Sequence, residues 1–206
     1  MVDKITSFPA GITTGGNCPQ PVLRFTQAKK LNCIAGTWDK ALFKARGIAI
    51  GSEFRGKGVN VALGPAMGPL GRMPAAGRNW EGFGSDPYLQ GIAAADTITG
   101  IQSTGVVATA KHFIGNEQEH FRNGPNAMST NIGDRTLHEV YLWPFQDSVK
   151  AGVGAVMCSY NKVNNSAACQ NSWLQNGILK DELGFQGFIM RLVLFPWGGC
   201  NFGLGC

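Results

Sequence analysis

The sequence contains few charged residues and no long apolar run. Asp, Glu, Lys and Arg make up 15% of its 206 residues, whereas an average soluble domain has roughly 25%. No segment approaches the roughly 20 uninterrupted apolar residues of a membrane-spanning helix, so we expect a soluble chain with no membrane partner. Hydrophobic residues at 44% exclude wholesale disorder. The length predicts one domain, or a piece of a larger one, with a large buried interior.

The sequence also lacks a basic stripe and a CxxC pair. Lys and Arg outnumber Asp and Glu by 18 to 13, but they are scattered singly and form no patch that would neutralise successive phosphates. We therefore expect no nucleic-acid partner. The six Cys show no zinc-site spacing, so we expect no structural metal, and we assign no cofactor.

The signals of cellular compartment conflict. Residues 1–4 carry charge but no apolar h-region follows, so the chain shows no signal peptide and alone would be intracellular. Cys158 and Cys169, however, bracket a short loop that contains Asn164-Asn165-Ser166, the only N-x-[ST] sequon. A disulfide between these two Cys and a glycan on Asn164 would both indicate secretion. Together they favour an extracellular parent protein.

One pattern recurs four times: an amphipathic helical stretch, a Gly, and a short apolar run. The predicted helix and strand pairs cover residues 37–55 and 59–63, 87–104 and 106–110, 137–150 and 154–157, and 172–183 and 185–190. Thr37 is the expected cap of the first helix, Pro87 starts the second, and Pro144 is expected to kink the third. This alternation predicts an α/β fold with a parallel sheet and right-handed crossovers. Four such strands form either part of a TIM-like (β/α) barrel or a small open sheet.

Polar residues cluster where these strands end. Gly64-Pro65, Lys111-His112 and Cys158-Ser159-Tyr160 each lie at the end of an apolar run, and a barrel brings the carboxyl ends of different strands together. The Lys111-His112 pair is the sharpest of these features, because an ammonium beside an imidazole can hydrogen-bond sugar hydroxyls or act as an acid and base pair. The alternative is a solvated Lys beside a packed His, but the position at a strand end favours function.

Two loops carry further candidates. Residues 71–83 mix Arg, Asn, aromatics and Gly, a composition that suits a pyranose ring, although such loops are often only solvated. Residues 116–120, Asn-Glu-Gln-Glu-His, look at first like a metal or carboxylate site. Their two Glu would diverge on a helix, so a structural role in the loop is favoured over metal ligation. No metal is assigned.

These motifs make the chain similar to a known family. Residues 56–190 closely resemble the amino-terminal barrel domain of fungal glycoside hydrolase family 3 beta-glucosidases. The matching segments are 57–61, 64–65, 68–72, 77–83 (Gly-Arg-Asn-Trp-Glu-Gly-Phe), 110–113 (Ala-Lys-His-Phe), 119–120, 157–161 and 184–188. Residues 7–14 and 37–55 look like the same family's preceding region. The resemblance therefore implies a partial TIM-like barrel over most of the chain.

The resemblance also implies an activity and a set of site residues. The family hydrolyses terminal, non-reducing beta-D-glucosyl residues with retention, which implies a beta-glucoside or cello-oligosaccharide as substrate and a secreted enzyme. Arg78, Lys111 and His112 match residues that bind glucose hydroxyls in the subsite where the bond is cut. Met157 and Tyr160 match residues that line the same subsite.

The chain departs from the family at the nucleophile. A retaining glycosidase needs one carboxylate as nucleophile and a second as acid and base. The resemblance places the nucleophilic Asp in a Met-Ser-Asp-Trp run where this chain reads Met190-Arg191-Leu192-Val193, so Leu192 occupies that position and no catalytic residue is assigned. The family's acid/base Glu falls beyond residue 206, and a sugar-binding Asp of its first strand falls before residue 1. We therefore expect this chain to be inactive or nearly so.

Two segments have no counterpart in the family. Residues 17–35 contain two Pro, two Cys and a basic run without periodicity, and residues 191–206 are apolar and Gly-rich. We interpret residues 1–190 as one partial family 3 amino-terminal domain with a non-homologous insert at 17–35, and 191–206 as an aberrant tail. Unspliced intron is our hypothesis for the origin of both segments.

Two other functions stay open. A non-catalytic sugar-binding fragment would keep Arg78, Lys111 and His112 without turnover. A Schiff-base aldolase would use Lys111, because a desolvated Lys at a barrel strand end can act as a nucleophile, but the family resemblance argues against it. An incomplete barrel would also leave the strand at 185–190 as an unpaired edge, which predicts aggregation.

Overall fold

The computed structural model describes residues 5–6, 34–69, 71, 78–124 and 126–191. Their main feature is a five-stranded sheet in the order β1-β2-β3-β5-β8, in which every neighbouring pair is parallel. Its strands are β1 (Ile5–Thr6), β2 (Val61–Ala62), β3 (Val107–Phe113), β5 (Ala155–Cys158) and β8 (Phe188–Arg191). A helical segment separates each pair of consecutive strands in this sheet. The predicted α/β fold with a parallel sheet is therefore confirmed.

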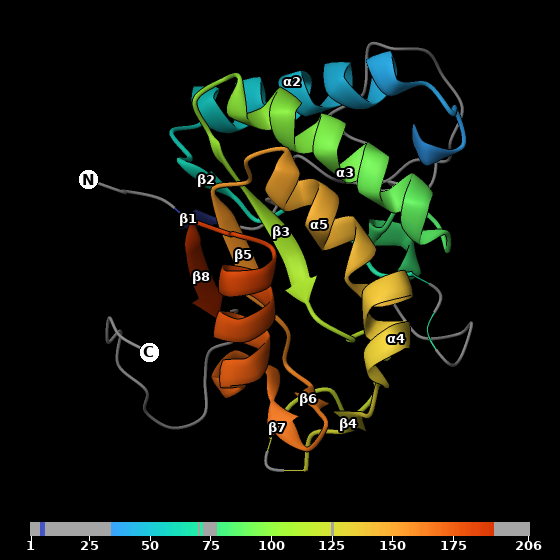
Figure 1. Cartoon of the computed structure of the whole chain (residues 1–206). Helices are drawn as coiled ribbons and strands as arrows, with labels where there is room; N and C mark the ends of the chain where they lie inside the picture. The colour runs from blue at the N-terminus through green and yellow to red at the C-terminus, as the bar shows by residue number, and fades with distance from the viewer. Residues whose placement is uncertain (1–4, 7–33, 70, 72–77, 125, 192–206) are drawn as a thin grey trace.

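Three helices pack together beside the sheet (Figure 1). They are α2 (Lys40–Gly56), α3 (Pro87–Gln102) and α5 (Trp143–Lys150). Helix α3 contacts both α2 and α5, and α3 and α5 also contact β3. The shorter helical segments are η2 (Asn79–Glu81), α4 (Asp134–Thr136), η3 (Leu137–Tyr141), η4 (Ala168–Gln170) and η5 (Trp173–Glu182). A small second sheet joins β4 (Ser129–Thr130), β6 (Lys162–Val163) and β7 (Ser166–Ala167).

Aspartates cap the two long helices. The Asp39 side chain accepts hydrogen bonds from the first backbone N–H groups of α2, and Asp86 does the same for α3, where Pro87 occupies the first turn. The expectation that Thr37 caps the first helix is therefore wrong. The Thr37 hydroxyl instead donates to the Ile34 carbonyl at 2.7 Å and accepts from the Asp39 N–H at 3.3 Å. Two candidate caps stand two residues apart, and the carboxylate is the one that the helix uses.

Two predicted helices differ in detail from expectation. Pro144 lies in the first turn of α5, directly after the π-helical η3, so the 137–150 segment is two helical pieces. A Pro in the first turn costs no hydrogen bond, because its missing N–H would have no partner there. The predicted helix at 172–183 is η5, a π-helix, and it ends with the Leu183 N–H donating to the Ile178 carbonyl at 2.9 Å.

Helices α2 and α3 approach closely because each has a Gly at the contact. A Cβ on Gly47 would lie 2.5 Å from the Thr97 carbonyl oxygen, and one on Gly100 would lie 2.4 Å from the Lys44 carbonyl oxygen. Buried apolar side chains from these helices and from β3 form the main core, among them Phe43, Phe54, Ile98, Ile101 and Phe113. The two glycines therefore allow α2 and α3 to pack closely against each other beside the sheet.

The other end of the sheet is held differently. A disulfide joins Cys158, the last residue of β5, to Cys169 in η4. Within the described residues β8 pairs only with β5, and its Phe188 side chain is 47% exposed. No helix in the described part of the chain combines the length and apolarity needed to cross a membrane.

Candidate functional site

The chain after β2 runs alongside β3 and forms the floor of a small pocket. The Met67 N–H donates to the Lys111 carbonyl at 2.8 Å, and the Lys111 N–H donates to the Pro65 carbonyl at 3.1 Å. Gln90, fully buried on α3, holds Gly68 in place. Its side chain accepts from the Gly68 N–H and donates to the Gly68 carbonyl. The pocket lies at the carboxyl end of β3, where the sequence predicted functional groups.

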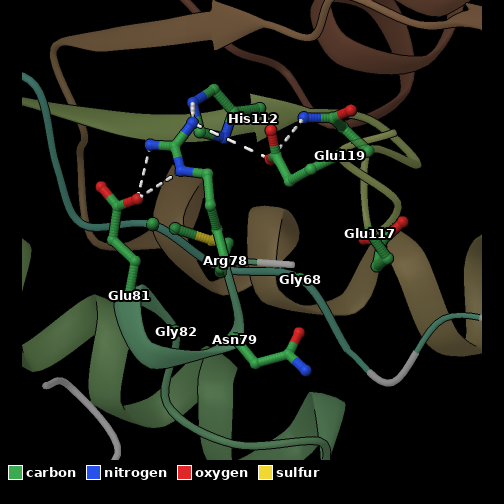
Figure 2. A pocket seen from close by; sticks show the side chains of 11 residues that line it. Gly68, Arg78, Asn79, Glu81, Gly82, His112, Glu117 and Glu119 are labelled. Carbon is green, nitrogen blue, oxygen red and sulfur yellow. Dashed lines mark hydrogen bonds and ion pairs between the residues drawn. The ribbon is translucent and has the colours of Figure 1, made fainter. Parts of the chain in front are cut away.

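The pocket has a volume of about 50 Å³ and is lined mainly by polar side chains. Its lining consists of Ala66, Met67, Gly68, Arg78, Asn79, Glu81, Gly82, His112, Asn116, Glu117 and Glu119. Figure 2 shows the Arg78 side chain extending between Glu81 on one side and His112 with Glu119 on the other. Arg78 is therefore the centre of the polar cluster.

A bulge at the end of β3 brings two neighbouring residues into this cluster. Lys111 pairs with Met157 of β5, but Phe113 pairs with Cys158, so β3 has one residue more than β5 between these pairs. In a regular strand successive side chains point to opposite faces. The extra residue changes that alternation, and both Lys111 and His112 lie within reach of the groups around Arg78. Sequence reasoning predicted these residues but not the bulge.

A single buried carboxylate, that of Glu81, binds two cations. Its Oε1 lies 2.7 Å from Lys111 Nζ, and its Oε2 accepts from Arg78 Nε at 2.8 Å and Arg78 Nη2 at 2.5 Å. Burial acts to raise the pKa of Glu81, but the charges of Lys111 and Arg78 bring it below its ordinary value. Burial lowers the pKa of Lys111, and Glu81 opposes that effect. The Glu81 carboxylate thus favours the charged form of a Lys side chain of only 4% exposure.

His112 is neutral at physiological pH. Burial, followed by the charges of Lys111, Arg78 and Arg122, lowers the pKa of His112 well below 6.5. Its Nε2 lies 3.4 Å from Arg78 Nη1. Because a guanidinium can only donate, Nε2 accepts in this hydrogen bond and the ring proton is on Nδ1.

The 116–122 segment adds a second carboxylate. Glu119 forms an ion pair with Arg122, lies 3.9 Å from Arg78 Nη1, and accepts from Asn116 Nδ2 at 3.4 Å. The Arg122 guanidinium lies over the Tyr160 ring, 5.0 Å from its centroid. Both Glu119 and Glu81 therefore hold arginines. Among the described residues no three His, Cys, Asp or Glu side chains gather as metal ligands would.

Glu117 lines the same pocket but has a different environment. Its Oε2 is buried and has no hydrogen-bond partner among the described residues. A Cβ on Gly68 would lie 3.0 Å from its Oε1, and a Cβ on Gly71 would lie 2.5 Å from its Cβ, so these two glycines make room for it. Burial raises the pKa of Glu117 to about 8, which leaves the carboxyl mostly protonated at neutral pH.

The structure brings together most of the predicted sugar-binding residues. Arg78 and His112 line the pocket, and Lys111 joins them through Glu81. Tyr160 lies on the Arg122 side of the cluster. Met157 is 1% exposed and packs in a separate buried cluster with Val61 and Leu63. Leu192 lies outside the described residues.

Sequence reasoning assigned no role to two residues of the cluster, Glu81 and Arg122, and for Glu119 it favoured a structural role in the loop, which fits its contacts with Asn116 and Arg122. One signal could have indicated two ion pairs. Glu81 follows Arg78 by three residues across the helical turn η2, and Arg122 follows Glu119 by three across the turn at residues 120–121, so both pairs have a short sequence spacing. The contact between Glu81 and Lys111 crosses thirty positions of the chain and has no local signal.

Comparisons with known proteins agree on the family. The Glycosyl hydrolase family 3 N terminal domain matches residues 21–191. Probable beta-glucosidase E of Emericella nidulans is 60% identical over 210 residues, which cover 100% of this chain and 19% of that protein. Probable beta-glucosidase F of Aspergillus fumigatus is 57% identical over 202 residues, covering 97% of this chain and 21% of that protein. The chain thus spans about a fifth of the length of these curated relatives.

Solved structures give the same answer. Chaetomium thermophilum beta-glucosidase has a TM-score of 0.76 and 61% identity, covering 80% of this chain and 20% of that one. Beta-glucosidase 3B from Thermotoga neapolitana, in complex with glucose, has a TM-score of 0.73 and 39% identity, covering 80% and 22%. The N-terminal domain of these proteins is a TIM-like barrel, and the parallel sheet described above is part of one. The chain therefore belongs to glycosyl hydrolase family 3 and corresponds to that family's N-terminal domain.

Proposed function

We propose that this chain supplies the glucose-binding part of a beta-glucosidase that removes terminal, non-reducing beta-D-glucosyl residues with retention, as in the breakdown of cello-oligosaccharides. The observation that carries the proposal is that Arg78 and His112 line one pocket and that Glu81, in the same lining, binds both Arg78 and the buried Lys111. A family member in complex with glucose supports glucose as the ligand.

The chemistry of the pocket suits hydroxyl groups. Lys111 has three N–H donors and Arg78 has five, and Glu81 uses only some of them. His112 is neutral and offers one donor and one acceptor. Such a set can donate to sugar hydroxyl oxygens and accept a hydroxyl proton. The Glu81 and Glu119 carboxylates already bind cations, and the protonated Glu117 carboxyl is a poor nucleophile. None of these three carboxyl groups is therefore proposed as the nucleophile, and the proposed role of the pocket is to bind the sugar.

We further propose that the 206-residue chain, on its own, binds glucose without turnover. Leu192 at the position of the family's nucleophilic Asp supports this, because an alkyl side chain cannot form a glycosyl-enzyme bond. The sugar-binding fragment is thus the function expected of the isolated chain, and hydrolysis is the function of the family.

Two assays distinguish sugar binding from hydrolysis. Calorimetry measures glucose binding, and a chromogenic aryl beta-D-glucoside measures turnover. We expect saturable glucose binding and no release of the aryl group above the buffer rate. Arg78→Ala should weaken binding by about tenfold or more, because it removes charged hydrogen bonds. Arg135→Ala is the matched control, since that side chain is 86% exposed and lies outside the pocket. Multiple turnovers would refute the proposal that the isolated chain is inactive. Absence of glucose binding would refute the proposal that the pocket binds sugar.

The aldolase alternative loses support from the ion pair. A Schiff-base lysine attacks as a neutral amine, whereas Lys111 Nζ lies 2.7 Å from the Glu81 carboxylate, which retains the ammonium proton. Borohydride treatment with a small aldehyde or ketone is expected to leave Lys111 unmodified. A trapped adduct on Lys111 would reverse this preference.

We propose secretion as the location of the protein, with a glycan on Asn164. The Cys158–Cys169 disulfide supports an oxidising compartment. Asn164 is exposed, and its Nδ2 donates to the Ile132 carbonyl at 3.3 Å, which leaves one amide proton for substitution. The chain and the Asn164→Gln variant are expressed in a secreting fungal or yeast host and then treated with a glycan-removing enzyme. The treatment should lower the mass of the wild-type chain and leave the mass of the variant unchanged. An unchanged mass would exclude the glycan.

A further inference from the structure

We infer that Glu81 is a positioning residue for sugar binding, which acts by fixing Arg78 and Lys111 and does not itself contact the sugar. The inference rests on the proposed sugar-binding function. Its physical basis is that one carboxylate uses both oxygens, one on each cation, so the two cations have a common anchor.

The anchor joins two separate parts of the fold. Arg78 directly precedes the single turn of η2 and Glu81 is its last residue, and the Glu81 N–H donates to the Arg78 carbonyl at 3.0 Å. Lys111 belongs to β3, whose position is set by the sheet. The Glu81 carboxylate therefore ties a short loop element to the barrel strand. Without it, nothing else in the described ion pairs connects Lys111 to the loop.

The anchor also determines which donors remain for a ligand. Arg78 turns its Nε and Nη2 toward Glu81, and this leaves Nη1 directed at His112 and Glu119. Lys111 has three N–H groups, and its ion pair with Glu81 is the one described for it, so further N–H groups can donate to a ligand. Two N–H groups of the planar guanidinium donate to the same carboxylate oxygen, which fixes the orientation of the guanidinium as well as its place. The unused donors are thus held in a defined direction before any sugar arrives.

Charge balance gives a readout that a purely structural role would not change. The charged or titratable groups that face Lys111 are Glu81, Arg78, Glu119 and the adjacent His112. Burial and Arg78 both favour the neutral Lys111 amine, and Glu81 is the main group opposing them. Glu81→Gln keeps the shape of the side chain but removes the opposing charge. The Lys111 amine then loses its proton at a lower pH, and sugar binding that depends on the ammonium weakens as pH rises.

The first measurement needs no sugar. In chain labelled at lysine 13Cε, the Lys111 resonance is assigned by its loss in Lys111→Met and followed through a pH titration. We expect the Lys111 titration to move to lower pH in Glu81→Gln and to stay unchanged in Glu139→Gln. Glu139 is a suitable control because its carboxylate forms an exposed ion pair with Arg135. An unchanged Lys111 titration in Glu81→Gln would overturn the inference whether or not the chain binds glucose.

The second measurement is glucose binding by calorimetry across neutral pH. Glu81→Gln should bind about tenfold more weakly than the wild type, and the deficit should grow with pH. Glu81→Gln/Lys111→Met removes both partners, which avoids leaving a buried charge unpaired if the single variant folds poorly. Its binding should be weak at every pH, with no added pH dependence. If wild type and Glu81→Gln bind glucose equally, only the inference fails. If the wild type does not bind glucose, the proposed function fails with it, and the titration still decides whether Glu81 favours the charged form of Lys111.

Discussion

Glu117 is predicted to make the fold less stable as pH rises, and Glu117→Gln is predicted to remove that effect. Burial raises the pKa of this carboxyl from 4.5 to about 8 in the folded chain. Between these values the folded state keeps a proton that the unfolded state releases. The free energy of unfolding therefore falls by about 1.4 kcal/mol for each pH unit in this window. Across the whole window the loss reaches about 5 kcal/mol, a large share of a typical domain's stability.

The Gln side chain is a neutral substitute for the protonated carboxyl. At the acid end of the window Glu117→Gln and the wild type should differ little in stability. At the alkaline end the variant should be more stable, by about 4 kcal/mol at pH 8 relative to their difference at pH 5. Other titrating groups are common to both proteins, so the difference between the two curves isolates Glu117.

Urea unfolding followed by circular dichroism at several pH values measures both curves. Glu139→Gln is the control, because Glu139 lies in an exposed ion pair and its curve should run parallel to the wild type. Parallel curves for Glu117→Gln and the wild type would show that the Glu117 carboxyl is ionised at neutral pH. That result would refute the argument from burial.

Three further predictions concern the stability of the fold. Gly100→Ala should lower the free energy of urea unfolding by about 1–3 kcal/mol, because its Cβ would lie 2.4 Å from the Lys44 carbonyl oxygen, whereas Gly133→Ala, with open space at its Cβ, should lose less. Cys158→Ser/Cys169→Ser should lower the free energy of unfolding by about 3 kcal/mol, because the disulfide closes a loop with a sequence separation of 11. Equal thermal midpoints for the wild type and this double variant would contradict the prediction. The pKa of His138 is raised by its hydrogen bond to the Asp134 carbonyl and by Glu182, so its stabilising effect is present below pH 6.5 and lost as pH rises through the folded value. His138→Gln should therefore cost no more than about 1 kcal/mol, in acid only, and an equal cost at alkaline pH would exclude the charge as its cause.

The sequence predicts the order of elements well because each helix and strand has a local pattern. The strand before Lys111-His112 is an apolar run, and its carboxyl end is where the structure places the pocket. The limits of elements are less predictable. Asp39 and Thr37 are both good caps on local grounds, but in the structure the Thr37 hydroxyl donates to the Ile34 carbonyl and the Asp39 carboxylate caps the helix.

The anchoring contacts of the site could not be predicted from local patterns. In the sequence Glu81 is one acidic residue in a loop. Its ion pair with Lys111, which lies on a strand distant in sequence, depends on where the single helical turn η2 places it. Glu117 and Glu119 stand two residues apart, yet Glu119 pairs with two arginines, whereas the buried Oε2 of Glu117 has no hydrogen-bond partner among the described residues. Only the three-dimensional environment separates two such similar residues.

The bulge in β3 shows what would have to be transferred to rebuild this site elsewhere. A Lys-His pair grafted onto a regular strand would send one side chain into a barrel and the other toward its surrounding helices. In this protein β3 instead has one more residue than β5 between two neighbouring residue pairs. Engineering that copies only the two side-chain identities would thus lose the arrangement, and a graft must carry the irregular main chain with it.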